Sequence, residues 1–237
     1  TRDSAWNGVS ISSSNPTLSG TMTGIAATGT YNIKVTHLAQ AQTTALGGAG
    51  GIALAKDQAM GAAGTIKLTM GTESKDIDIT SSDTLTKIAT KINEAGMGIQ
   101  ASIVTDVDGK ERLMLRSKET GTDKAFTVDL GSLSSAPAAL GQPLTPTQTA
   151  QNAKVKLNGM DVESSSNTFA NTIPGMSFTV SELTSTAATL NVKADTEAMK
   201  KNIQEFVDTY NELNDLLTQS TKYVEESKTA GVLQGDS

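Results

Sequence analysis

The chain has 237 residues, no cysteine and a formal net charge of −6, and these features exclude several classes of protein. Without cysteine there is no disulfide framework and no thiolate metal site. The 19 basic residues are scattered along the chain and form no stripe of the kind that phosphate binding needs, so we expect no nucleic-acid partner. No apolar run approaches the roughly 18–20 residues that cross a bilayer, so we expect no membrane insertion.

The composition is typical of a folded chain with an aliphatic core. Hydrophobic residues make up 37%, and 21 glycines bring the apolar share close to the usual globular range. Aromatic residues are only 3%, so Ala, Val, Ile, Leu and Met must fill the core. Abundant Ser and Thr with modest charge favour a secreted structural protein built from many short strands.

The first part of the chain, residues 1–62, is predicted to be β-rich. Residues 9–11 and 22–27 are short candidate strands separated by a turn at Asn15-Pro16. Residues 31–35 alternate apolar and polar side chains, which predicts a strand. The glycine cluster at 47–51 then indicates a linker.

The middle part, residues 63–149, is predicted to be a compact α+β unit. Residues 65–70 and 76–80 form an expected hairpin, followed by a helix over 83–95 that Ser82 or Asp83 caps and Gly96 ends. Three further strands are expected after this helix, at 99–103, 113–115 and 126–128. A second linker is indicated by the prolines that follow: Pro137, Pro143 and Pro146.

Residues 150–194 return to β-rich sequence. An Asn158-Gly159 turn between two alternating runs predicts a hairpin over 155–162, and more strands are expected at 177–180 and 189–192. The fold class we predict is α+β, with residues 1–62 and 150–194 forming one β-rich head domain and residues 63–149 a second domain inserted into it. Spacing alone leaves a linear string of domains as an alternative.

The last part, residues 195–237, is predicted to begin a helical leg. Its apolar residues follow one another at alternating spacings of four and three, the pattern of a coiled-coil seam: Met199, Ile203, Phe206, Tyr210, Leu213 and Leu217, continued by Ser220 and Val224. Asp195 is the candidate N-cap. A helix over 195–224 would be roughly 45 Å long, and its seam needs a covering partner.

No other segment predicts a helix of comparable length, so we expect the chain to be a fragment of a longer protein whose partner helices are missing. The alternative is a helix that folds back on its own β domain.

No stretch predicts catalysis, a cofactor or a metal site. His37 is the single histidine and has no second ligand to share a metal. Asp76 and Asp78 share one strand face, as a sugar-cleaving pair would, but the other face is apolar and so these carboxylates should face water. Residues 106–109 begin like a calcium loop, yet Ser117 stands where that loop needs Glu, and a hairpin turn explains them.

Several stretches, taken in order, resemble the FliD family of flagellar filament-capping proteins. Residues 31–42 (YNIKVTHLAQAQ) are similar to the strand that opens the family's first head domain. Residues 150–175 resemble a motif shared by hook-associated proteins and flagellins. Residues 206–211 (FVDTYN), 221–223 and 231–236 resemble the start of the family's C-terminal leg.

The resemblance implies a homo-oligomeric cap, of four to six subunits, at the tip of the bacterial flagellum. Family members leave the cell through the flagellar type III export system, with an export chaperone as a partner before secretion. They promote the folding and insertion of flagellin. The implied interaction surface is the leg seam. The alternative function is a tip-exposed adhesin in which the head domains bind host mucin or glycan.

Overall fold

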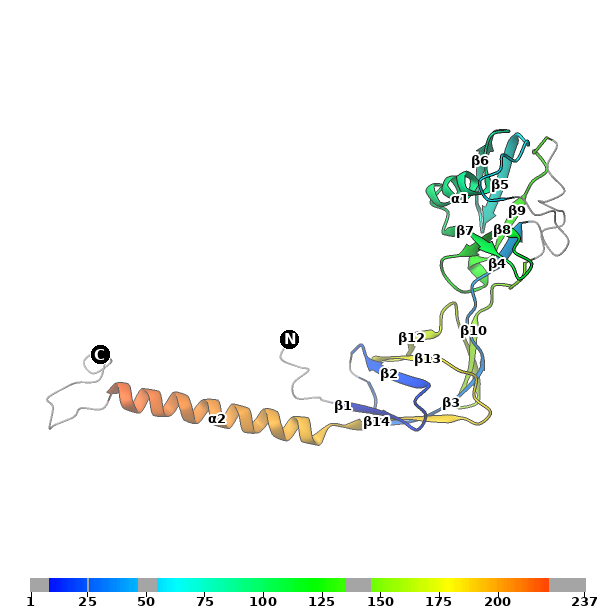
Figure 1. Ribbon diagram of the computed structural model, residues 1–237. Coiled ribbons are helices and arrows are strands. Elements are labelled where there is room, and N and C mark those ends of the chain that lie inside the picture. The colour runs from blue at the N-terminus through cyan, green and yellow to red at the C-terminus, as the bar shows by residue number, and fades with distance from the viewer. Residues whose placement is uncertain (1–8, 25, 47–54, 135–145, 222–237) are drawn as a thin grey trace.

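The computed structural model describes residues 9–24, 26–46, 55–134 and 146–221. Within these ranges the chain forms fourteen strands, two α-helices and one 3-10 turn. They are arranged as two β-rich units and a long helix that leads away from both (Figure 1). We call the unit next to the long helix the proximal unit and the other the distal unit.

The proximal unit joins the first and the last strands of the described chain. Its five-stranded antiparallel sheet has the order β1 (Val9–Ser13), β14 (Ala188–Ala194), β3 (Gly29–His37), β10 (Ala153–Leu157) and β11 (Met160–Ser164). A three-stranded sheet has the order β12 (Thr168–Ile173), β13 (Met176–Val180) and β2 (Leu18–Met22). Apolar side chains of both sheets share one core, in which the rings of Phe169 and Phe178 stack 4.8 Å apart.

The distal unit contains every described element from residue 43 to residue 129. One antiparallel sheet has the order β4 (Thr43–Leu46), β8 (Glu111–Ser117) and β7 (Ile99–Thr105). The other has the order β6 (Glu73–Ile79), β5 (Gly64–Met70) and β9 (Phe126–Asp129). Helix α1 (Leu85–Glu94) and the 3-10 turn η2 (Thr122–Lys124) complete it. Its core shares no buried residue with the proximal core.

Local sequence explains many of these elements. In β10 the buried Ala153, Val155 and Leu157 alternate with exposed lysines, as a strand with one solvated face requires. The Asn158-Gly159 turn has φ of 48° and 89°, which these two residue types tolerate best. The predicted hairpin is therefore confirmed.

Helix α1 buries the predicted apolar stripe, which consists of Leu85, Ile88, Ala89 and Ile92. The predicted cap was wrong. The N-cap is Thr84, whose Oγ1 accepts a 3.3 Å hydrogen bond from Lys87 N–H. Asp83 is buried instead and accepts from the Thr80 N–H at 2.8 Å. Which of these neighbouring residues caps the helix therefore depends on hydrogen bonds that form only in the folded turn.

Three strands differ from the sequence expectation. The strand predicted at 22–27 lies earlier, because β2 ends at Met22 and the N–H groups of Thr23 and Gly24 bond the Gly175 carbonyl. Strands β4 and β12 had not been predicted. Leu46 of β4, together with Met60 and Ala62, lies in the distal core. The linker glycines at 47–51 and two linker prolines, Pro137 and Pro143, lie outside the described residues.

Candidate functional site

The long helix α2 (Thr196–Thr221) is the candidate interaction element. Its first turn is capped by Asp195, whose Oδ1 accepts a 2.9 Å hydrogen bond from the Ala198 N–H. The predicted N-cap is thereby confirmed, and the carboxylate also lies at the positive end of the helix dipole. Helix α2 continues from β14 and extends away from the proximal unit (Figure 1). It does not fold back on the β-rich part of the chain.

The predicted seam lies exposed along this helix. Met199, next to the proximal unit, is half-buried. The exposed fractions of the other five side chains are 45% for Ile203, 63% for Phe206, 61% for Tyr210, 52% for Leu213 and 47% for Leu217. Large apolar side chains exposed in one continuous row are typical of interaction surfaces, and the role of this row in association stays a prediction. Ser220 has no described side chain, and Val224 lies outside the described residues.

Two apolar residues that the sequence analysis missed widen the seam. Val207 is 42% exposed and Leu216 is 60% exposed. At 3.6 residues per turn they lie on opposite flanks, each about 80–100° from the seam's centre. Asn202, Thr209 and Asn214 also flank the seam and are uncharged. Testing the positions beside each seam residue for apolar side chains would have found this broad surface.

The opposite face of α2 is acidic. It carries Glu205, Asp208, Glu212 and Asp215, all exposed, and no basic residue occurs between positions 202 and 221. Glu205 pairs with Lys201 at 3.7 Å, an exposed pair of little energetic weight. The helix therefore has a broad uncharged apolar face and a charged face suited to water.

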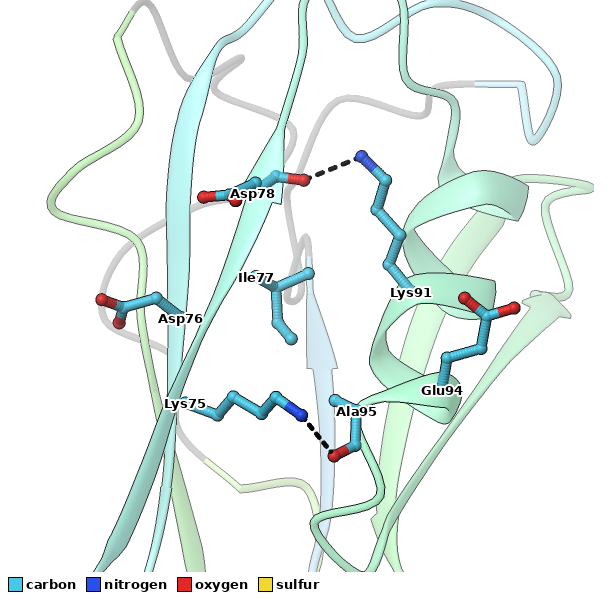
Figure 2. Close-up of a pocket in the computed structure, with 7 residues that line it drawn as sticks. All are labelled: Lys75, Asp76, Ile77, Asp78, Lys91, Glu94 and Ala95. Carbon is cyan, nitrogen blue, oxygen red and sulfur yellow. Dashed lines mark hydrogen bonds between the residues drawn. The ribbon is translucent and has the colours of Figure 1, made fainter.

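A shallow groove between β6 and α1 is the second candidate (Figure 2). Two lysines cross it. Lys75 Nζ donates to the Ala95 carbonyl at 2.9 Å, and Lys91 Nζ donates to the Asp78 carbonyl at 2.8 Å. Figure 2 shows the carboxylates of Asp76 and Asp78 pointing away from α1, and both residues are exposed. The two lysine hydrogen bonds therefore hold α1 against β6. The carboxylates of Asp76 and Asp78 do not point into the groove.

Asp83 and Asp106 are among the carboxylates whose pKa is held below the usual range. Burial raises the pKa of Asp83, but hydrogen bonds from Lys91 Nζ at 2.6 Å and from Thr80 N–H outweigh it. The pKa of Asp106 is lowered chiefly by the Lys110 N–H, and further by Arg112 Nε at 2.8 Å. Both groups act within local structure, since Asp106 organises the turn between β7 and β8.

The described residues contain no group of three or more His, Asp or Glu side chains placed to hold a metal ion. His37 lies exposed at the end of β3, with Nδ1 3.3 Å from Thr36 Oγ1. Neither described helix is long and apolar enough to span a membrane. The absence of cofactor, metal and catalytic residues stays a prediction.

Sequence comparisons place the chain among flagellar proteins. Residues 150–237 match the family "Flagellar hook-associated protein 2 C-terminus", and residues 65–119 match the "Flagellin hook IN motif". The flagellin-type motif is thus matched at 65–119, whereas the expected position, 150–175, lies within the match to the hook-associated protein. Flagellar hook-associated protein 2 of Escherichia coli K12 is 30% identical over 98% of this chain and 53% of its own length. The B-type protein of Pseudomonas aeruginosa is 30% identical over 95% and 52%. The chain spans about half the length of these relatives.

Solved structures agree with the sequence comparisons. The D1-D2-D3 domains of the flagellar cap protein FliD from Escherichia coli superpose with a TM-score of 0.79 at 30% identity, covering 98% of this chain and 66% of that one. FliD from Pseudomonas aeruginosa gives 0.72 at 29% identity, covering 88% and 98%. The suspected resemblance is confirmed: this chain belongs to the family of flagellar hook-associated protein 2, the flagellar cap protein FliD.

Proposed function

We propose that the protein containing this chain is a structural cap at the distal tip of the bacterial flagellar filament. In this proposal it is exported through the flagellar type III system, binds an export chaperone beforehand, and assembles into a homo-oligomer outside the cell. The cap promotes folding and insertion of flagellin and prevents its loss. The observation that carries the proposal is the exposed apolar seam of α2, which extends from a β-rich head in a member of the cap family.

The seam is proposed to join the head to a helical leg. Burying a large apolar side chain contributes about 1.5–3 kcal/mol, so six seam positions provide a strong drive to associate. Val207 and Leu216 broaden the surface on both flanks. A surface wider than a strict two-per-heptad seam is typical of a helix bundle with more than one neighbour, rather than of a two-stranded coiled coil.

The two β-rich units are proposed to be separate domains, one inserted into the other. Separate cores support this division, as does the absence of a sheet shared between the described strands of the two units. The predicted boundaries were 1–62 with 150–194, 63–149, and 195–237 for the leg. Because β4 pairs with β8 and Met60 lies in the distal core, we propose a first boundary near residue 42 instead of 62. Cooperative two-state unfolding of residues 40–151 expressed alone would test it.

Complementation tests the cap. The gene for the full-length protein is expressed in a motile bacterial strain that lacks its own cap protein. Restored filaments support the proposal, whereas flagellin monomer released into the medium, without filaments, contradicts it. Two variants sharpen the test. Phe206→Asp with Leu213→Asp should abolish capping. Glu205→Gln with Glu212→Gln, on the opposite face of the same helix, should leave it intact.

The adhesin alternative has no support from the structure or from the relatives. The names of the relatives refer to the hook and the cap. A structural role, without catalysis, is the function we propose.

A further inference from the structure

Two chain segments connect the proximal and distal units, and they run side by side. Gln40 N–H donates to the Gln151 carbonyl at 2.8 Å, and Gln151 N–H donates back to the Gln40 carbonyl at 3.0 Å. Further along, Thr43 N–H donates to the Gln148 carbonyl at 2.8 Å. We call this pair of segments the ribbon. A two-stranded ribbon is weak against bending on its own, and relative motion is the default for units joined in this way.

The distal end of the ribbon is anchored by a buried glutamine. Gln42 is 4% exposed. Its Nε2 donates to the Phe126 carbonyl at 2.6 Å, and its Oε1 accepts from the Phe126 N–H at 3.1 Å. Its backbone N–H and carbonyl both bond Ser117 at 3.0 Å. Because Phe126 begins β9 and Ser117 ends β8, Gln42 ties the ribbon to both distal sheets. Bending must therefore occur on the proximal side.

On that side, a distal loop lies directly against the proximal unit. Thr120 Oγ1 donates to the Ser165 carbonyl at 2.7 Å, and Thr122 N–H donates to Asn152 Oδ1 at 2.8 Å. Between them, Gly121 N–H donates to the Gln40 carbonyl of the ribbon at 3.2 Å. These bonds cross from one unit to the other beside the ribbon, so they add a second, off-axis attachment.

The distal loop approaches the proximal unit so closely at residue 121 that only glycine fits there. The φ of Gly121 is +105°, a conformation that side chains disfavour. A Cβ at this position would lie 2.7 Å from Ser165 Cβ and 2.8 Å from the Ser165 carbonyl oxygen. Any side chain would therefore push the loop off the proximal unit. Gly109 has a similar positive φ of +73°, yet nothing lies within 4 Å of its Cβ position.

We propose that Thr120, Gly121, Thr122, Asn152 and Ser165 form a lock that holds the two β-rich units in one orientation. With the lock closed, the ribbon and the off-axis contact together make the two units one rigid body. With the lock open, the ribbon becomes a hinge, while each unit keeps its own core. The proposal concerns these contacts alone and does not depend on the cap function.

Spin labels test the lock directly, because the chain has no natural cysteine. Cysteines replace Ser12 in β1 and Lys87 in α1, two exposed positions in different units. Double electron–electron resonance then measures the distance distribution between the labels. A second pair, at Lys67 and Lys87, reports on the distal unit alone. Gly121→Val opens the lock by steric pressure, and Gly109→Val imposes similar backbone strain away from it. Asn152→Ala with Thr120→Val removes the hydrogen bonds that depend on these two side chains of the lock and adds no bulk to it.

The expected result is a narrow inter-unit distribution in the parent protein and in Gly109→Val. Gly121→Val and the Asn152→Ala/Thr120→Val variant should broaden it roughly twofold or more, while the pair within the distal unit stays narrow. A broad distribution in the parent protein would overturn the lock. So would an inter-unit distribution that stays as narrow in Asn152→Ala/Thr120→Val as in the parent protein. The latter variant also decides the question if Gly121→Val fails to fold.

Discussion

The two α-helices carry similar apolar patterns but have opposite environments. Helix α1 has ten residues, and its stripe is covered by its own unit, with Ile88 and Ile92 both 0% exposed. Helix α2 has 26 residues, and its seam residue Phe206 is 63% exposed. The pattern alone marks a face to be buried, and it does not say whether the same chain provides the cover. Four predictions test this difference, from the largest expected effect to the smallest.

The seam of α2 should act in association and leave the β-rich units unaffected. Phe206→Asp with Leu213→Asp removes two side chains worth about 1.5–3 kcal/mol each in burial. We expect loss of self-association, measured by light scattering, with the β-sheet circular dichroism unchanged. Glu205→Gln with Glu212→Gln is the matched control and should associate normally. Unfolding of the head together with the helix would show that α2 belongs to the head's core.

The apolar stripe of α1 should contribute to the free energy of unfolding of the distal unit. Ile88→Ala leaves a cavity in the distal core and should lower the free energy of unfolding by about 2–5 kcal/mol. Leu213→Ala, at an exposed seam position, should change it by less than about 0.5 kcal/mol in the dissociated chain. Urea denaturation followed by circular dichroism measures both. Equal losses would mean that the two helices have the same environment.

The contact between α1 and β6 should depend on pH through Asp83. Because Lys91 and Thr80 hold its pKa below the usual value of about 3.9, its contribution to stability is present above that pH. The contribution is lost as the pH falls through the folded-state pKa. Asp83→Asn should therefore lower stability at pH 7 by about 1–3 kcal/mol, with a smaller difference in acid. Asp78→Asn, an exposed carboxylate on β6, should cost far less at either pH. A loss that is independent of pH would contradict the ion pair.

The start of α2 should depend on its cap. Asp195→Ala removes the acceptor for the Ala198 N–H and should reduce helix stability by about 0.5–2 kcal/mol. Thermal unfolding of the helix, followed at 222 nm, measures the effect. Asp195→Ser keeps an acceptor and should recover most of the loss. If the helix is equally stable in Asp195→Ala and in Asp195→Ser, a side-chain acceptor at this position is unimportant for α2.

Local features were predictable because they depend on neighbouring residues. The turn at Asn158-Gly159, the stripe of α1 and the Asp195 cap follow from backbone preference and side-chain spacing. Strand β12 was missed because its pairing shifts register between Phe169 and Ile173, with Asn171 at a φ of 56°. Such a bulge interrupts the alternation that a pattern search needs.

The candidate site was predictable only in part. The spacing of the apolar residues predicted all six seam positions. The exposure of Val207 and Leu216 on the flanks of α2 is visible only in the structure. The seam's role in association is still a prediction. Strand β4 was missed because Thr43–Leu46 is short and forms a strand only by pairing with β8, almost seventy residues later.

The sequence by itself determined where strands alternate, where turns must fall and which face of each helix is apolar, because these depend on side chains only a few residues apart. Tertiary structure alone decided which elements share a core, which helix is covered, and how the two units meet. The contact between Gly121 and Ser165 illustrates the reason. It joins residues far apart in the chain, and neither residue carries a local signal that it will meet the other.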